Sequence, residues 1–590
     1  MNRTIRARIH ESAVKRVTRI YAATAAEILA EILQNSRRAG ATRVRIAVAA
    51  PAGRPDEIAP ATGDTPLTVT ISDDGGGIAD PAVLLSFGEN GWDGELVQRE
   101  DAAGFGFASL ARRNCAVSSR PRSPDGSTMP GWRVDLAPEH FLAEAEAEVH
   151  PDDGAPFPHG TAISFEATES AAAIRNAAEN AARHYPLPVV FEDRTQDDTA
   201  MPEDLPRRAF LDGEIHAEPW RGLVFGVFRN RRAGYRDPDL SFFGLTLTVA
   251  LPTVETVHGA AWTVLADVDD CPDLELVLPA RKEAVENAFL KEMREAARLA
   301  IYRAMAVDPS PRPAFEDWTR AREAGIGIAP PPAVLRPWRP SMAEADYWRE
   351  SAKLAEAGPD SSGGALVMDC DPEPPQAQAL WRAAERDGFA PRMFEADRRL
   401  EGYSWYDRLD RATAISVLAS GDGEWIWIDD WPRPERARPG AAQLPSRPAA
   451  IRIELTVRSA VGPHRTHLLP ADAAFAGEAW SGLDDALPLV TEDSTLQPYE
   501  LAALLRAGFF SPSDDVEADS WETQRDRFDE DALHLATRLL LSDDEACRQS
   551  IAEAVRRELM WFVPGDRAVD IRIRRPDVTV TLAAAGEATP

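Results

Sequence analysis

The sequence contains few cysteines and no long apolar run. Its four cysteines are scattered along 590 residues without CxxC or metal-finger spacing, which excludes a disulfide framework. No apolar stretch reaches the ~18 residues that a membrane-spanning helix needs, and the amino-terminal segment lacks the apolar core of a secretory signal. We therefore expect a cytoplasmic protein that does not associate with membranes.

Positive charge is also scarce in this chain. It carries 65 Lys and Arg against 96 Asp and Glu, which gives a formal net charge of −31. Because such a field repels phosphate, general binding to nucleic acid is disfavoured. The hydrophobic share of 44% and the charged share of 27% are those of a globular protein that can bury a core.

The length of 590 residues exceeds what one hydrophobic core serves. Successive helix and strand patterns predict an α/β multidomain protein, with an α/β sandwich over residues 1–195 and a second α/β domain over 196–328. The prolines of APPPAVLRPWRP predict a linker over 329–341. Mixed strand and helix patterns predict an α+β region of unknown role over 342–590.

The first segment of chemical interest is an amphipathic helix predicted over residues 24–39. Glu31 and Asn35 are four residues apart on it and therefore share one face. A carboxylate there can accept a proton from water, and an amide oxygen can hold a metal ion. Taken alone, the pair is more typical of a solvated helix face.

A second segment, DDGGGI, follows a strand predicted over residues 67–71. Its carboxylate Asp73 can accept a hydrogen bond from an exocyclic amine such as that of adenine, and its glycines allow a sharp turn close to a planar ligand. Taken alone, this pattern is an ordinary turn.

Two weaker signals follow along the chain. Gly104, Phe105 and Gly106 form a glycine-rich loop that runs into a predicted helix, where backbone N–H groups favour phosphate. Neither a Walker lysine nor a dinucleotide fingerprint accompanies this loop. Gly160 and Thr161 open a further predicted strand.

The order of these four segments resembles the GHKL superfamily of ATPases, whose nucleotide site is the Bergerat fold. EILQNSRRA is similar to the first sequence box of that family, SDDGGGI to the second and GFGFASL to the third. Among the branches, the closest resemblance is to the ninety-kilodalton heat-shock chaperones. LELVLPARKEAVENAFL is similar to the segment in which those chaperones carry a catalytic arginine on a middle, transducer-like domain.

The resemblance implies a role for each matching residue. Glu31 would be the general base, Asn35 would hold Mg²⁺, and Asp73 would read the adenine of ATP. Arg281 would reach the γ-phosphate, with Lys282 as the alternative. The remaining nucleotide contacts implied are Gly75, Gly77, Ile78, Gly104, Phe105, Gly106 and Thr161.

One residue departs from the family pattern. Chaperone relatives usually have an acidic residue where Arg38 stands. Arg38 lies seven residues after Glu31 and could share the helix face that lines the pocket. Its role is left open by the sequence.

The function expected on this basis is a Mg²⁺-dependent ATPase that drives a clamp-like conformational cycle on a protein client or partner, with a homodimer as a further expectation. The alternatives are a DNA-maintenance ATPase of the MutL or topoisomerase kind and a nucleotide-gated interaction protein with negligible turnover. The net charge speaks against the former. A histidine kinase is disfavoured because too little chain precedes the first helix for a dimerising bundle.

Overall fold

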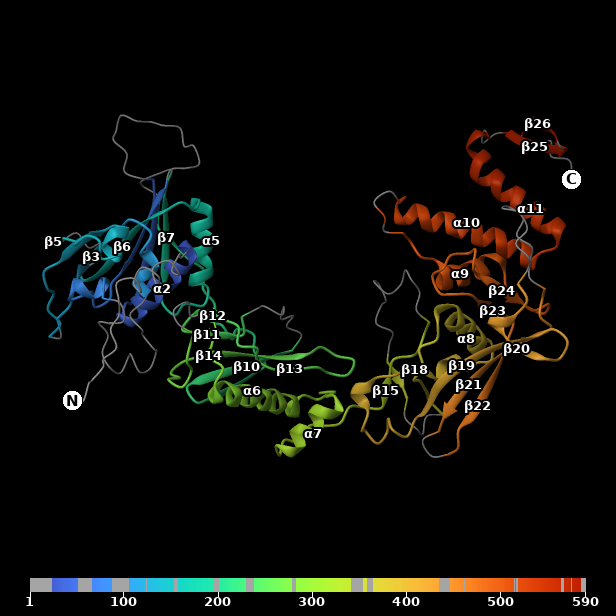
Figure 1. Ribbon diagram of the computed structural model, residues 1–590, viewed down its shortest axis with the longest axis horizontal. Coiled ribbons are helices and arrows are strands. Elements are labelled where there is room, and N and C mark those ends of the chain that lie inside the picture. Colours follow the sequence, from blue (N-terminus) through green and yellow to red (C-terminus); the bar gives the residue numbers. More distant parts are fainter. Residues whose placement is uncertain are drawn as a thin grey trace, which may run out of the picture. The chain divides into compact units, whose positions relative to one another are not determined.

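The computed structural model (Figure 1) divides into two compact units, Met1–Pro330 and Pro331–Pro590. Each unit is described by itself. The structure describes residues 24–50, 66–86, 106–123, 125–152, 158–195, 201–229, 238–277, 283–340, 354–357, 364–433, 446–459, 462–513, 515, 518–563, 567–574 and 576–584.

The first sheet of the amino-terminal unit has eight strands in the order β5-β4-β3-β6-β2-β1-β7-β8. Neighbouring strands are antiparallel except β1 and β7, which are parallel. The strands are β1 (Val44–Ala49), β2 (Leu67–Asp73), β3 (Cys115–Arg120), β4 (Trp132–Leu136), β5 (Val149–Pro151), β6 (Gly160–Ala167), β7 (Val189–Arg194) and β8 (Glu203–Asp204).

Helix α2 (Ala25–Arg38) packs on this sheet beside α5 (Ala171–Ala182). It begins with a capping box, in which Thr24 accepts from the Glu27 amide and the Glu27 carboxylate accepts from the Thr24 amide at 2.8 Å. Its apolar side chains join the alternating buried residues of the strands in one core. The short helices of this part are η1 (Pro81–Leu84), η2 (Gly106–Leu110) and α4 (Pro138–Phe141).

A second sheet follows in the same unit, in the order β12-β11-β14-β10-β9, with β13 paired to β14. Helix α6 (Ala288–Val307) lies along it (Figure 1) and buries its apolar face there, and α7 (Phe315–Glu323) follows. The strands are β9 (His216–Trp220), β10 (Leu223–Arg229), β11 (Leu240–Phe242), β12 (Leu245–Leu247), β13 (Thr253–Val254) and β14 (Trp262–Val268).

Helix α2 contacts both sheets of this unit. The side-chain amide of Gln34 donates to the main-chain oxygen of Phe243 at 3.0 Å. The guanidinium of Arg37 lies 3.9 Å from the centre of the Phe243 ring, a cation–π distance. The helix that carries Glu31 and Asn35 is therefore also a contact between the two parts of the unit.

The carboxy-terminal unit has its own core around a six-stranded mixed sheet, in the order β18-β17-β19-β21-β22 with β20 on β19. Three two-stranded sheets, β15-β16, β23-β24 and β25-β26, accompany it. The strands of the whole unit are β15 (Val334–Leu335), β16 (Ala355–Glu356), β17 (Leu366–Met368), β18 (Met393–Glu395), β19 (Asp410–Ser420), β20 (Trp425–Trp427), β21 (Ala450–Arg458), β22 (Arg465–Ala471), β23 (Ala473–Ala476), β24 (Leu487–Val490), β25 (Arg567–Arg574) and β26 (Asp577–Ala584).

The helices of that unit complete the fold. They are α8 (Pro374–Arg386), η3 (Ala390–Arg392), η4 (Arg398–Leu400), η5 (Ile428–Asp430), α9 (Pro498–Phe509), α10 (Trp521–Leu540), α11 (Asp543–Ala554), η6 (Val555–Leu559) and η7 (Met560–Phe562). The prediction of an α/β multidomain protein is confirmed. In the described part of the chain, no helix is long and apolar enough to cross a membrane.

Candidate functional site

The best-defined polar group in the first sheet is the carboxylate of Asp73, which ends strand β2 and is only 7% exposed. One of its oxygens accepts from the Ser36 hydroxyl at 2.9 Å, and the other accepts from the Gly75 amide at 2.9 Å. Burial raises the pKa of Asp73, although the hydrogen bonds from Gly75, Ser36 and Thr161 oppose that rise. A carboxylate has about four acceptor positions, so Asp73 can accept further bonds.

Strand pairing places Thr161 beside this carboxylate. Asp73 is opposite Thr161 in the register of β2 and β6, and Thr161 is opposite Ser119 in the register of β6 and β3. The hydroxyls of Ser119 and Thr161 lie 3.2 Å apart, and the Ser119 hydroxyl accepts from the Ile78 amide at 2.8 Å. Four predicted site positions, Asp73, Gly75, Ile78 and Thr161, therefore belong to one connected cluster.

Ser119 was missed in the sequence analysis. It is 1% exposed and stands in a strand whose burial alternates residue by residue. A polar residue at a buried position of an alternating strand is the signal that points to it, because buried hydroxyls require partners.

The glycine turn after β2 packs tightly between Ala39, which follows α2, and Arg120, which ends β3. A Cβ on Gly75 would lie 2.9 Å from the Cβ and the main-chain oxygen of Ala39, while the Gly76 amide donates to that oxygen at 2.8 Å. Gly77 has φ +71°, and a Cβ there would lie 2.7 Å from the Arg120 oxygen. Side chains are therefore excluded at both positions.

Asp74, the residue after Asp73, uses its carboxylate to hold the turn in place. Its carboxylate accepts from the amides of Thr42 and Arg43 at 2.7 and 3.0 Å, and from the Thr42 hydroxyl. Partial burial raises the pKa of Asp74, but these hydrogen bonds outweigh burial and hold the pKa below its ordinary value. Asp74 thus ties the turn to the segment that enters β1.

Glu31, Asn35 and Arg38 lie on one face of α2, as their spacing predicts. The Arg38 guanidinium donates from Nη1 to the Asn35 amide oxygen at 3.1 Å, and the same nitrogen lies 4.0 Å from a Glu31 carboxylate oxygen. The Arg38 side chain is 2% exposed and that of Glu31 is 19% exposed. Asn35 directly precedes Ser36, whose hydroxyl donates to Asp73.

Several predicted site residues lie outside the described residues, namely Gly104, Phe105, Arg281 and the alternative Lys282. Gly106 begins η2, which lies against α2. The helix predicted after the glycine loop is a five-residue 3₁₀-helix, Gly106–Leu110. So short a turn sums few peptide dipoles.

These residues differ in how well they fit the two expected ligands. Adenine fits, because Asp73 is buried and held in place with acceptor capacity to spare. Magnesium does not fit this arrangement, because the amide oxygen predicted to hold it, on Asn35, already accepts from a guanidinium. In the part of the chain that the structure describes, no group of three or more His, Cys, Asp or Glu could hold a metal.

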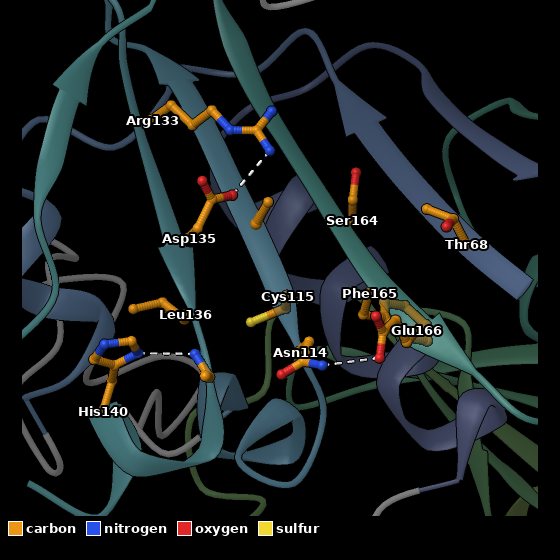
Figure 2. A pocket seen from close by; sticks show the side chains of 12 residues that line it. Thr68, Asn114, Cys115, Arg133, Asp135, Leu136, His140, Ser164, Phe165 and Glu166 are labelled. Carbon is orange, nitrogen blue, oxygen red and sulfur yellow. Dashed lines mark hydrogen bonds and ion pairs between the residues drawn. The ribbon is translucent and has the colours of Figure 1, made fainter. Parts of the chain in front are cut away.

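A separate cavity of about 460 Å³ lies over β3, β4 and β6 (Figure 2). Its polar groups bind one another, since Arg133 pairs with Asp135 at 2.8 Å and Asn114 donates to Glu166 at 3.0 Å. Burial raises the pKa of the Cys115 thiol to about 12, which keeps it protonated and unreactive. No residue of the cluster around Asp73 lines this cavity.

Comparisons with known proteins give limited similarity. A scan of protein-family models and a search of curated proteins both found no match. The chain is similar to the B subunit of DNA gyrase from Myxococcus xanthus at 14% identity and a TM-score of 0.31, over 49% of this chain and 95% of that one. It is similar to the N-terminal domain of a DNA repair protein at 11% identity and a TM-score of 0.25, over 46% and 91%. Neither likeness carries a functional argument.

Asp74→Asn should destabilise the protein at pH 7, whereas Asp73→Asn should not. The pKa of Asp73 is higher in the folded protein than in the unfolded chain. The destabilisation caused by burying its charge is therefore fully present above the folded-state pKa, and it is lost as the pH falls toward the pKa of the unfolded state. The asparagine amide keeps an acceptor for Gly75 and gains a donor for Ser36, so Asp73→Asn should not lower the free energy of unfolding.

Asp74 shows the reverse linkage. The pKa of Asp74 is lower in the folded protein than in the unfolded chain. The ionised carboxylate therefore stabilises the fold above the unfolded-state pKa, and this stabilisation is lost as the pH falls through the folded-state pKa. Asp74→Asn should lower the free energy of unfolding by ~1 kcal/mol at pH 7 through its lost hydrogen bonds. Urea unfolding of both variants between pH 7 and pH 4 measures this, and equal destabilisation by the two would show that the Asp73 charge supports the fold.

Gly77→Ala should destabilise the protein more than Gly126→Ala. Both glycines have positive φ, +71° and +83°, but a Cβ meets nothing within 4 Å at Gly126 and meets main-chain atoms at 2.7 Å at Gly77. We expect ~1 kcal/mol for Gly126→Ala from backbone strain alone and ~1–3 kcal/mol more for Gly77→Ala. Equal shifts in thermal unfolding would mean that the turn does not press against β3.

Proposed function

We propose that the amino-terminal unit binds an adenine nucleotide where the end of α2, the glycine turn after β2 and the start of β6 meet, and that it hydrolyses ATP as a GHKL-type ATPase. The observation that carries this proposal is the buried Asp73 carboxylate, bonded to Ser36 and Gly75 and paired in register with Thr161. A carboxylate so placed can accept from the exocyclic amine of adenine.

The energetic cost of this carboxylate supports a ligand-binding role. Taking a charge out of water is unfavourable, and burial is the largest influence on the pKa of Asp73. Perturbed titratable groups of this kind gather at functional sites. The glycine turn beside Asp73 packs closely against Ala39 and Arg120. The Asp73 carboxylate is therefore held in place before any ligand binds.

The proposed chemistry needs little from the protein beyond position and charge. Glu31 is the candidate base that orients the attacking water, because it is a carboxylate on the same helix as Ser36 and its side chain keeps partial access to solvent. We propose Arg281, or Lys282, as the cation from the second domain. The described residues on either side, 275–277 and 283–285, pair with each other through hydrogen bonds of 2.8 and 2.9 Å.

A chaperone-like clamp that acts on a protein client or partner is the finer form of this proposal. The contacts of Gln34 and Arg37 with Phe243 support it, because they join the helix of the site to the second sheet. The net charge of −31 favours a protein partner over DNA. A homodimer remains part of the proposal.

Glu31→Gln should abolish hydrolysis while nucleotide binding is retained. Loss of a general base lowers kcat by ~10²–10⁴-fold, whereas the adenine contacts lie on other residues. Phosphate release and calorimetric titration with ATP measure the two quantities. The matched control is Glu27→Gln, one turn earlier on α2, because glutamine also completes a capping box; turnover equal to the wild type in Glu31→Gln would reject Glu31 as the base.

Asp73→Asn should weaken nucleotide binding itself. Replacing an acceptor by an amide donor opposite the adenine amine leaves an unsatisfied polar pair, which corresponds to a ~10–100-fold loss of affinity. Asp74→Asn is the control and should bind normally, because its carboxylate is engaged by Thr42 and Arg43. Unchanged affinity in Asp73→Asn, measured by the same titration, would remove the adenine site from this place.

A further inference from the structure

The polar face of α2 contains a cation of its own. Glu31, Asn35 and Arg38 follow one another at spacings of four and three residues, so their side chains project from the same side of the helix. The guanidinium of Arg38 lies between the other two, 3.1 Å from the Asn35 amide oxygen and 4.0 Å from a Glu31 carboxylate oxygen, all within described residues.

The guanidinium of Arg38 is buried beside an amide oxygen and a carboxylate. Its side chain is 2% exposed, and a guanidinium stays protonated even where it is buried. The guanidinium and the Glu31 carboxylate are 4.0 Å apart, at the outer limit of an ion pair. Arg38 therefore brings a fixed positive charge to the face where the nucleotide phosphates are proposed to bind.

A divalent metal at Asn35 would have to share the amide oxygen with this charge. That oxygen accepts from Arg38, and a second cation placed against it would be repelled at close range. The guanidinium can itself do what the metal is needed for, because its planar set of five donors binds phosphate oxygens in pairs while it holds another acceptor.

We propose that Arg38 acts as a built-in cation in place of the metal, so that this site binds the phosphates of an adenine nucleotide without requiring Mg²⁺. This inference rests on the proposed function, since it concerns the same site. It assigns Arg38 a binding role and removes Asn35 from the role of metal ligand. Asn35 becomes the residue that orients the guanidinium.

The test is calorimetric titration of the full chain with ATP, once with excess Mg²⁺ and once with EDTA. The wild type should bind with affinities that agree within about twofold. Arg38→Gln should lose ~10–100-fold in EDTA, the effect of removing a charge-assisted hydrogen bond, and Mg²⁺ should then restore part of the loss. Arg38→Lys should bind in EDTA at an affinity between those two, because it keeps the charge without the planar fork.

Arg43→Ala is the matched control for removal of one positive charge near the same helix. Arg43 pairs with Asp204 at the surface, where the two side chains are 51% and 77% exposed, and its loss should change neither titration. The circular dichroism of each variant reports whether it is folded. If Arg38→Gln does not fold, the wild-type comparison of Mg²⁺ with EDTA still decides the proposal.

Two negative results are distinguishable. Wild-type binding that falls tenfold or more in EDTA would overturn the role of Arg38 and would leave the nucleotide site in place, with the guanidinium displaced by the metal. The absence of ATP binding under both conditions, in the wild type and in all variants, would reject the proposed function and this inference together.

Discussion

The burial of one carboxylate constrains how the first sheet and helix α2 of the amino-terminal unit meet. Asp73 ends a strand in a largely buried position, so most of the hydrogen bonds to its oxygens must come from the protein. Ser36 supplies a donor from α2, and Gly75 supplies another from the turn. The end of the helix is thereby held against the end of the strand, and only glycine allows the backbone to come so close.

Much of the local structure could be predicted from the sequence because it depends on local patterns. The helix over 24–39 is observed as Ala25–Arg38, and the strand over 67–71 is observed as Leu67–Asp73. Amphipathic spacing is enough to indicate such a helix. The same spacing placed Arg38 on the face of Glu31, where the structure has it.

What could not be predicted depends on register between distant strands. Nothing local to Thr161 or Ser119 indicates that they lie beside Asp73, because that placement follows from the pairing of β2 with β6 and of β6 with β3. The type of the helix that begins at Gly106, a 3₁₀-helix of five residues, also could not be read from the sequence pattern. The bond between Arg38 and Asn35 depends on rotamers that sequence spacing does not determine.

Helix α2 has a further property that follows from its contacts on both sides. Neighbouring residues on a helix are about 100° apart around its axis, so Gln34, which holds Phe243 of the second sheet, stands next to Asn35 of the polar face. A ligand that rolled the helix about its own axis would move both side chains at once. Such a rotation of α2 would change its contact with Phe243 directly, without any change in the chain segment that joins the two sheets.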